Sequence, residues 1–371
     1  MNIGIDARLF GESGIGRYIR NLINELKKID KQNSYFVFLL ARDFEKFDQS
    51  ENFKKIKADI PWYGFAEQIK LPYLIGKYKI DLMHFPHFNV PILYKGKFVV
   101  TIHDLIHQRF SMQRSTTHGR IFYNLKKVGF NIALSSALLK SEKIIVPSEF
   151  VKHDILNNSS VSADKIVVTL EGVEETFSKL ASSVTEEEVR KVLEKFDIKP
   201  PFIFYLGNAH PHKNVEGLIE CFLELRKKYQ YLKLVLSGHD HYFWERLKSG
   251  VHHPDIIFTS FVSDKEMISL LKKASLRVIP SFEEGFGIPV LEAFAVCCPV
   301  ACSDTSSLPE VAGEGAMYFN PYSTKDMSEK IIKMLGSDTL RSDLVKKGKK
   351  QLTKFSWKKM AEQTLAVYRS I

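Results

Sequence analysis

The sequence predicts an α/β protein built from two doubly wound domains, each with a parallel sheet covered by helices. Short apolar segments of strand length alternate with segments of helical period along most of the chain. The alternation stops at a polar stretch, residues 178–200, and then starts again in the same order. Alternating strands and helices are typical of parallel sheets with helices on both faces.

The predicted strands form two series, one on each side of the polar stretch. They cover residues 2–6, 35–41, 81–85, 98–102, 143–146 and 166–169, and then 202–206, 233–237, 256–260, 276–280, 299–303 and 316–319. Helical periods cover 15–29, 122–139, 215–229, 264–273, 288–295 and 324–334. We therefore expect an N-terminal domain over 1–178 and a C-terminal domain over 200–355, joined by a linker that holds one helix, 186–196.

The last segment, residues 357–371, has the pattern of an amphipathic helix. Ser356 is positioned to cap its N-terminus. Five apolar side chains recur on one face at helical spacing: Trp357, Met360, Ala361, Leu365 and Tyr368. This face predicts that the helix packs against a domain rather than ending in solvent.

The composition is that of a globular protein, with 44% hydrophobic and 26% charged residues. No signal peptide and no apolar run long enough to span a bilayer are visible, so we expect a cytoplasmic location. The net charge of +10 fits an anionic partner or a solvated basic surface. No recognition helix, zinc knuckle or aromatic RNA-binding signature is present, so no nucleic-acid partner is expected.

The cysteines and carboxylates do not predict a metal site. Cys221, Cys297, Cys298 and Cys302 lack zinc-ligand spacing, and we interpret them as reduced core residues. An Asp-x-Asp sequence that would hold a divalent ion is absent. We therefore predict neither a metal nor another cofactor.

Ligands of open α/β sheets bind at the carboxyl ends of the strands, so the loops after strands are searched for chemistry. The first such loop carries Gly11, Gly14 and Gly16 before a helix. Glycines allow close approach of the backbone, and a helix N-terminus offers N–H groups to an anion; a simple tight turn is the alternative. The spacing is not the G-x-G-x-x-G fingerprint, which disfavours a dinucleotide oxidoreductase.

Histidines follow two of the other strands. His103 lies at the carboxyl end of the predicted strand 98–102, where it can contact a polar ligand and change charge near neutral pH. A structural histidine beside a turn is the alternative. His84 and His87 accompany the strand 81–85, and we consider them candidates for lining an acceptor site.

The second domain carries the strongest signals. Lys213 precedes a helix in the loop 207–214, where its ammonium can neutralise a diphosphate. Glu284 lies before the helix that Pro289 opens, and Glu292 about one turn inside it. Carboxylates accept paired hydroxyl hydrogen bonds, which suits a sugar. A solvent-facing glutamate would not explain one acid in an otherwise apolar helix.

Together these motifs resemble those of the retaining glycosyltransferases of family 4, also called group 1, which have the GT-B fold. The resemblance covers nearly the whole chain. It rests on the glycine loop with Arg17-Tyr18, Ile102-His103-Asp104, Val146-Pro147-Ser148-Glu149, the loop 207–214, the segment from Glu284 to Glu292, Ser306-Ser307-Leu308-Pro309-Glu310 and Phe355-Ser356-Trp357. It implies two Rossmann-like domains facing a central cleft, with the helix 357–371 packed back on the N-terminal domain.

The resemblance also implies the roles of the site residues. His103, Lys213 and Glu284 would be catalytic: His103 beside the sugar, Lys213 at the departing diphosphate and Glu284 at the sugar hydroxyls. Glu292 would hold the ribose. The other donor contacts would come from Gly14, Gly16, Asn208, His212, Gly285, Phe286 and Gly287. Many relatives carry an arginine where this chain has Asn208 or His212, so one cation is missing and protonated His212 is a possible substitute.

The implied reaction moves a hexose from a nucleoside diphosphate sugar to a glycan or lipid-diphosphate-linked acceptor, with retention and without a metal, in cell-surface polysaccharide or lipopolysaccharide synthesis. Mannose from GDP-mannose is the first expectation, because the stretches 101–105 and 207–214 look like those of bacterial mannosyltransferases; UDP-linked sugars stay open. A sugar-nucleotide epimerase, which would turn over without an acceptor, and a non-catalytic nucleotide-sugar-binding protein are the alternatives.

A contact with the inner face of the plasma membrane is a further expectation. The stretch 109–143 interleaves basic and aromatic residues, which suits a peripheral contact with anionic lipid. Its members are Arg109, Phe110, Arg114, Arg120, Phe122, Tyr123, Lys126, Lys127, Phe130, Lys140 and Lys143. A solvated surface is the alternative.

Overall fold

The protein is described here by a computed structural model that covers residues 1–109, 120–238 and 242–371, without the side chains of 107–108 and 120–127. The chain divides into two compact units. The N-terminal unit contains Met1–Glu171 and Ser356–Ile371, and the C-terminal unit contains Gly172–Phe355. In the described ranges, no helix is long and apolar enough to cross a membrane.

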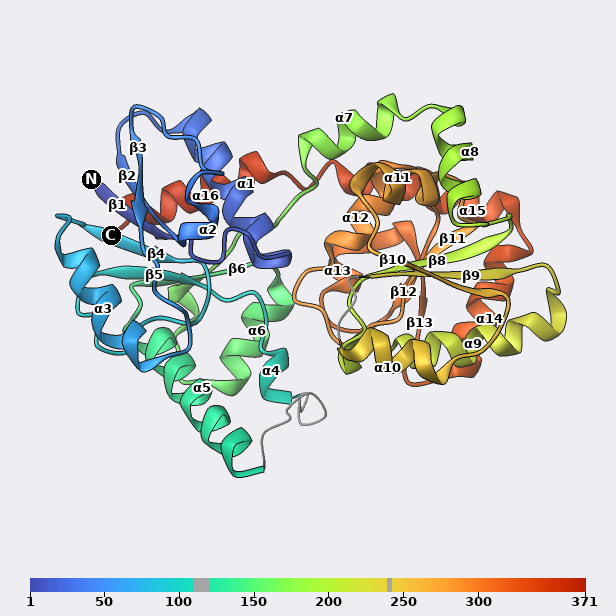
Figure 1. Cartoon of the computed structure of the whole chain (residues 1–371), viewed down its shortest axis with the longest axis horizontal. Coiled ribbons are helices and arrows are strands. Elements are labelled where there is room, and N and C mark those ends of the chain that lie inside the picture. The colour runs from blue at the N-terminus through green and yellow to red at the C-terminus, as the bar shows by residue number, and fades with distance from the viewer. Residues whose placement is uncertain (110–119, 239–241) are drawn as a thin grey trace. The chain divides into compact units, whose positions relative to one another are not determined.

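The N-terminal unit is built on a seven-stranded parallel sheet with the order β3-β2-β1-β4-β5-β6-β7. Its strands are β1 Asn2–Asp6, β2 Ser34–Leu39, β3 Phe53–Lys57, β4 Leu82–Phe85, β5 Phe98–Thr101, β6 Lys143–Val146 and β7 Ile166–Val168. Its helices are α1 Gly14–Ile29, α2 Ala41–Phe44, α3 Phe65–Gly76, α4 Ile106–Arg109, α5 Arg120–Lys140, α6 Glu149–Asn158 and α16 Trp357–Arg369. Within this unit α1 and α16 lie on one side of the sheet and α5 and α6 on the other (Figure 1).

The helix α16 is fixed to the sheet by a chain of buried hydrogen bonds. The hydroxyl of Tyr368 bonds to Nδ1 of His84 at 2.6 Å, and Nε2 of His84 bonds to Oγ1 of Thr101 at 2.8 Å. The Tyr18 hydroxyl reaches the same Thr101 oxygen at 3.1 Å. Ser356 caps α16 through its hydroxyl, as the sequence predicts. His84 therefore does not line an acceptor site, because its fully buried ring joins β4, β5 and α16.

This buried histidine gives the unit a pH dependence. Burial, together with the nearby His103, lowers the pKa of His84 to about 3, whereas an unfolded histidine titrates near 6.5. Between these pH values the unfolded chain takes up a proton that the folded chain refuses. Stability from this group is therefore complete above about pH 6.5 and falls, by up to about 1.4 kcal/mol per pH unit, as the solution is made more acidic.

Denaturant unfolding of the wild type and of His84→Gln between pH 7.5 and 5 measures this effect. The variant starts less stable but should lose less stability on acidification. His153→Gln, which removes an exposed histidine of α6, should keep the wild-type slope. Identical slopes for all three proteins would show that His84 does not carry the dependence.

The C-terminal unit is built on a six-stranded parallel sheet with the order β10-β9-β8-β11-β12-β13. Its strands are β8 Phe202–Leu206, β9 Lys233–Ser237, β10 Ile256–Ser260, β11 Leu276–Ile279, β12 Val300–Ser303 and β13 Ala316–Phe319. Its helices are α7 Glu175–Ser183, α8 Glu186–Lys195, α9 Val215–Lys228, α10 Tyr242–Gly250, α11 Asp264–Lys273, α12 Ile288–Ala295, α13 Leu308–Ala312, α14 Thr324–Leu335 and α15 Asp338–Leu352. In this unit α11 and α12 lie on one side of the sheet and α9 and α10 on the other (Figure 1).

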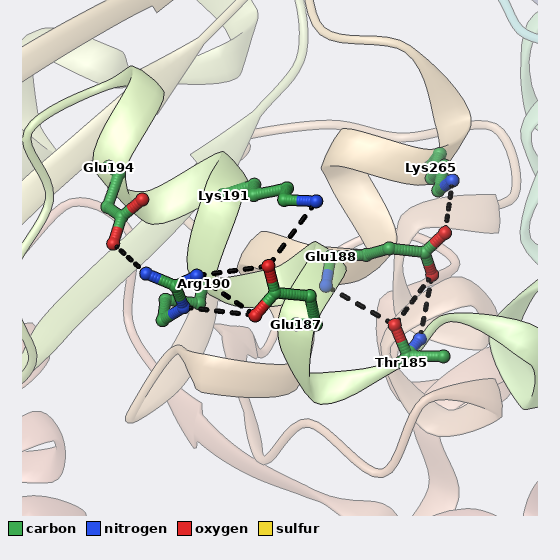
Figure 2. A network of polar contacts seen from close by, with 7 residues as sticks. All are labelled: Thr185, Glu187, Glu188, Arg190, Lys191, Glu194 and Lys265. Atoms are coloured by element: carbon green, nitrogen blue, oxygen red, sulfur yellow. Dashed lines mark hydrogen bonds and ion pairs between the residues drawn. The ribbon is translucent and has the colours of Figure 1, made fainter.

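The polar stretch 178–200 contains the end of α7 and the whole of α8, both of which belong to the C-terminal unit. Thr185 and Glu188 form a reciprocal capping box at the start of α8, so the local sequence begins this helix (Figure 2). Glu188 also binds Lys265 of α11 at 2.6 Å, which lowers the pKa of its carboxyl to about 2. The stretch is therefore packed rather than extended.

Two sequence expectations about the fold are corrected. The strand β3 was not predicted, because it is a lysine-rich edge strand in which Phe53 alone is fully buried. Cys297 is exposed and has a φ of 61°, so it is not a core residue, whereas Cys221, Cys298 and Cys302 are buried and reduced.

Candidate active site

A lysine–glutamate ion pair lies at the carboxyl ends of β8 and β11 in the C-terminal unit. Nζ of Lys213 is 2.7 Å from both carboxylate oxygens of Glu284. The Lys213 side chain is 18% exposed and that of Glu284 10%, so both remain reachable from solvent. The hydroxyl of Ser281 donates to Oε1 of Glu284 at 2.7 Å and orients the carboxylate. The sequence predicted both charges but not their direct contact.

The two loops that carry this pair are joined by Asn214. Its backbone is left-handed, with φ 53° and ψ 39°, and it ends the short 3₁₀ turn that contains Lys213. Its buried amide donates to the carbonyl oxygens of Pro280 at 3.1 Å and Pro321 at 3.0 Å. The loop 207–214 is thus held against the loop 280–287 and against the segment after β13, because the Asn214 side chain satisfies one backbone carbonyl group of each.

The N-terminus of α12 is the second part of the site. Gly287 precedes the helix with a φ of 104°, a conformation that favours glycine, and a Cβ there would lie 2.9 Å from Leu308. The hydroxyl of Ser307 donates to the carbonyl oxygens of Glu284 at 2.9 Å and Phe286 at 2.7 Å. Among the described residues no side chain caps α12. Pro289 has no N–H and the Val290 N–H donates to the Gly287 carbonyl oxygen at 2.9 Å, so this end offers an anion mainly the helix dipole and the Ile288 N–H.

Glu292 lies one turn into α12 and forms a buried ion pair that the sequence analysis missed. Its Oε2 accepts from Nη1 of Arg277 at 3.0 Å, and the two side chains are 6% and 1% exposed. Arg277 belongs to β11, in which every residue is buried. A charged residue inside such an apolar strand is the sequence feature that could have indicated a buried partner. The arginine neutralises the carboxylate and fixes its direction, because an unpaired buried charge would be strongly destabilising.

Asn208 and His212, the positions at which many relatives carry an arginine, lie in different environments. His212 is buried, and its ring stacks on that of His210 with centroids 5.8 Å apart. The backbone carbonyl oxygen of Asn208 accepts a hydrogen bond from the Tyr205 hydroxyl at 2.7 Å. Asn208 therefore shapes the turn, whereas the phosphate role of His212 stays a prediction.

The remaining candidates belong to the N-terminal unit. Gly14 is the first residue of α1 and is exposed, with open space where a Cβ would be. Gly16 is buried, and a Cβ there would lie 2.6 Å from the carbonyl oxygen of Phe10. Nη1 of Arg20 donates to that same carbonyl oxygen. The glycine loop is therefore shaped by close backbone approach at Gly16, and Gly14 leaves the helix N-terminus uncovered.

His103 follows β5 and is held in one orientation. Its Nε2 is 3.0 Å from the Pro86 carbonyl oxygen and its Nδ1 is 3.5 Å from Oε1 of Glu171. The Tyr18 ring packs edge-on against the imidazole with centroids 4.8 Å apart. The sequence identified His103 but gave no signal for Glu171, because their contact joins segments far apart in the chain.

The predicted membrane stretch is described only in part. Phe110 and Arg114, and the side chains of Arg120, Phe122, Tyr123, Lys126 and Lys127, lie outside the described residues. Phe130 is partly buried and packs against Phe88 of the core with centroids 4.6 Å apart. Arg109 pairs with Asp154. Over the described ranges no cluster of three or more His, Cys, Asp or Glu residues has the arrangement of a metal site.

Comparison with known families decides the identity. Residues 13–177 match the model described as "Glycosyltransferase Family 4", and residues 186–351 match "Glycosyl transferases group 1". The chain belongs to the family 4 (group 1) glycosyltransferases. It is therefore a glycosyltransferase, and its two doubly wound units are those of the GT-B fold, as the sequence predicts.

Individual relatives of this glycosyltransferase agree with the family. O-antigen chain mannosyltransferase B of Escherichia coli is 28% identical, with 96% of each chain covered. A glycosyltransferase crystal structure from Rickettsia africae has a TM-score of 0.74 at 20% identity and covers 100% of this chain and 97% of its own. The Anabaena protein Alr3699/HepE in complex with UDP-glucose has a TM-score of 0.76 at 14% identity, with both chains fully covered at 100%. The two structures show the fold alone.

Proposed function

We propose that this glycosyltransferase transfers mannose from GDP-mannose to a growing cell-surface glycan, with retention of configuration. The Lys213–Glu284 pair beside the uncapped α12 carries the proposal. An ammonium group and the positive end of a helix dipole there suit a diphosphate, and a carboxylate in the same place suits sugar hydroxyls. The similarity to the E. coli O-antigen mannosyltransferase supports mannose and a polysaccharide acceptor.

In the proposed reaction, the bond between the anomeric carbon and the diphosphate oxygen breaks as the acceptor oxygen bonds to the same face of that carbon. The acceptor proton passes to the departing phosphate. Lys213 stabilises the charge on the leaving group, and Glu284 orients the sugar. Glu292, neutralised by Arg277, receives the ribose hydroxyls, and His103 contacts the transferred sugar. This arrangement needs no metal ion, because Lys213 and the dipole at the N-terminus of α12 supply the positive charge.

Thermal unfolding with GDP, UDP, ADP and NAD tests the donor assignment. GDP at about one hundred times its Kd should stabilise the protein by about 2.7 kcal/mol. The stabilisation should disappear in Glu292→Ala and persist in Glu329→Ala, a matched change in the exposed carboxylate of α14. Each shift is measured from the variant's own ligand-free midpoint, because Glu292→Ala leaves Arg277 unpaired.

A double variant, Arg277→Met/Glu292→Leu, separates binding from stability. Because apolar residues of similar size replace the ion pair, the thermal midpoint should recover much of what Glu292→Ala loses. GDP should still not raise the thermal midpoint of the double variant. Stabilisation by UDP instead of GDP would contradict the GDP donor. Stabilisation by NAD alone would contradict the nucleotide-sugar site. A contact of residues 109–143 with anionic lipid stays a prediction beside this proposal.

A further inference from the structure

His103 and Glu171 form an ion pair inside the N-terminal unit. Nδ1 of His103 is 3.5 Å from Oε1 of Glu171, and the two side chains are 17% and 6% exposed. Glu171 follows β7, whose pairing with β6 continues through a hydrogen bond from the Thr169 N–H to the Val146 carbonyl oxygen at 2.9 Å. Among the described residues His103 is the one basic partner of Glu171. Because an unpaired buried carboxylate is destabilising, this pairing fixes both side chains.

Both ring nitrogens of His103 face oxygen acceptors. Nε2 is 3.0 Å from the Pro86 carbonyl oxygen, which can only accept, so Nε2 carries a proton. The atom that faces Nδ1 is a carboxylate oxygen, and two lone pairs would repel each other there if no proton lay between them. Imidazole is more basic than a carboxylate, so this proton rests on Nδ1 while Glu171 stays ionised. The geometry therefore favours an imidazolium whose charge Glu171 balances.

The other titratable groups beside His103 are uncharged. The Tyr18 ring packs edge-on against the imidazole with centroids 4.8 Å apart, and burial raises the pKa of Tyr18, so its hydroxyl keeps its proton. Burial, with His103 as the second cause, lowers the pKa of His84 to about 3, so that ring stays neutral. Among the described residues that interact with His103, Glu171 is thus the one whose charge can hold the imidazolium.

We propose that Glu171 is a positioning residue for sugar transfer, which holds His103 as an oriented imidazolium. The proposal rests on the proposed glycosyltransferase function and deepens it, because it states how His103 acts in that reaction. An imidazolium has no lone pair, so His103 contributes N–H groups and not a base, in agreement with a proton that passes from the acceptor to the departing phosphate. Since Glu171 balances its charge, the pair does not oppose the positive charge that develops at the anomeric carbon.

A double-mutant cycle on GDP-mannose turnover tests the positioning role. The rate of GDP release at saturating GDP-mannose should fall by about tenfold to a hundredfold in Glu171→Gln, as expected when a catalytic group is misplaced. The donor KM should stay unchanged, because the histidine acts mainly in the transition state. His103→Gln should lower kcat at least as much. The double variant His103→Gln/Glu171→Gln should be no slower than His103→Gln, because Glu171 acts through the histidine.

Imidazole ¹⁵N NMR of the donor-free protein gives a readout that does not depend on catalysis. The His103 signals are assigned by their absence in His103→Gln. In the wild type both ring nitrogens should carry a proton at the pH of the activity assay. In Glu171→Gln, Nδ1 should lose its proton, whereas Nε2 should keep the proton that it donates to Pro86. Glu171→Asp, which keeps the charge on a shorter side chain, should restore the Nδ1 proton and part of the lost kcat.

Glu142→Gln is the matched control, because it changes an exposed carboxylate of the same unit and should leave kcat and the spectrum unchanged. The GDP-induced thermal shift of Glu171→Gln should match the wild type, since the nucleotide is assigned to the C-terminal unit. Additive effects in the cycle, a wild-type kcat in Glu171→Gln, or an unprotonated Nδ1 in the wild type would overturn the positioning role. Absence of GDP stabilisation in the wild type would overturn the donor assignment instead, and the NMR spectra would still decide the state of the ion pair.

Discussion

Replacing Lys213 by methionine is expected to lower kcat for sugar transfer by about two to three orders of magnitude, the usual effect of removing a group that stabilises transition-state charge. The diphosphate gains charge as its bond to the sugar breaks, so the ammonium contributes more in the transition state than in the bound donor. Without donor, Glu284 holds Nζ of Lys213 at 2.7 Å and keeps it in place. Initial rates of nucleoside diphosphate release at saturating donor measure the effect.

Lys325→Met is the matched control, since this lysine of α14 is 86% exposed and should leave kcat unchanged. Glu284→Gln adds a second test, because it releases Lys213 from the pair while keeping one hydrogen-bond acceptor for the sugar. We expect it to lower kcat less than Lys213→Met does. If Lys213→Met only raised the donor KM and kept kcat, the lysine would bind ground state and transition state equally.

The sequence was sufficient to predict most of the strands and the loops that hold the charged residues. Parallel strands place their carboxyl ends at one edge, so Lys213 after β8 and Glu284 after β11 were each expected at that edge, although their direct contact was not predicted. The order of the sheet makes β8 and β11 adjacent, which explains the contact. The Ser356 cap and the buried face of α16 followed from the same local periodicity.

Side-chain contacts between segments far apart in the chain could not be predicted from the sequence. Arg277 and Glu292 lie on a strand and a helix, and nothing local shows that their side chains meet in the core. Glu171 reaches His103 from 68 positions away in the chain, as their numbers 171 and 103 show. The position of His84 beside a strand end predicts a ligand-lining residue, whereas its two hydroxyl partners, Tyr368 of α16 and Thr101 of β5, come from distant segments and make it structural. Side-chain pairing of this kind depends on tertiary packing, which residue patterns do not encode locally.

Replacing Arg8 by methionine is expected to destabilise the N-terminal unit by about 3–5 kcal/mol, the usual effect of removing one partner from a buried ion pair. Arg8 is 2% exposed and joins Asp6, Glu67 and the Ile60 carbonyl. Its loss would leave two buried carboxylates facing each other. Hydrogen exchange of peptides from each unit is the suitable measurement, because a chain with two compact units need not unfold in one step.

Arg42→Met provides the contrast, since Arg42 is 55% exposed, its ion pair with Glu12 is at the surface, and the buried Asp43, 3.5 Å from Arg42, keeps Lys46 as a partner at 2.9 Å; the loss of stability should stay under about 1 kcal/mol. The double variant Arg8→Met/Glu67→Gln should recover part of the loss, because one of the two facing charges is removed. The peptide that contains Trp62 and Tyr63 should exchange faster in Arg8→Met, since Glu67 would no longer be fixed beneath the Tyr63 N–H. An unchanged exchange rate there would mean that the buried network does not hold the turn at Tyr63, and the left-handed backbone of Tyr63, with a φ of 64°, would need another cause.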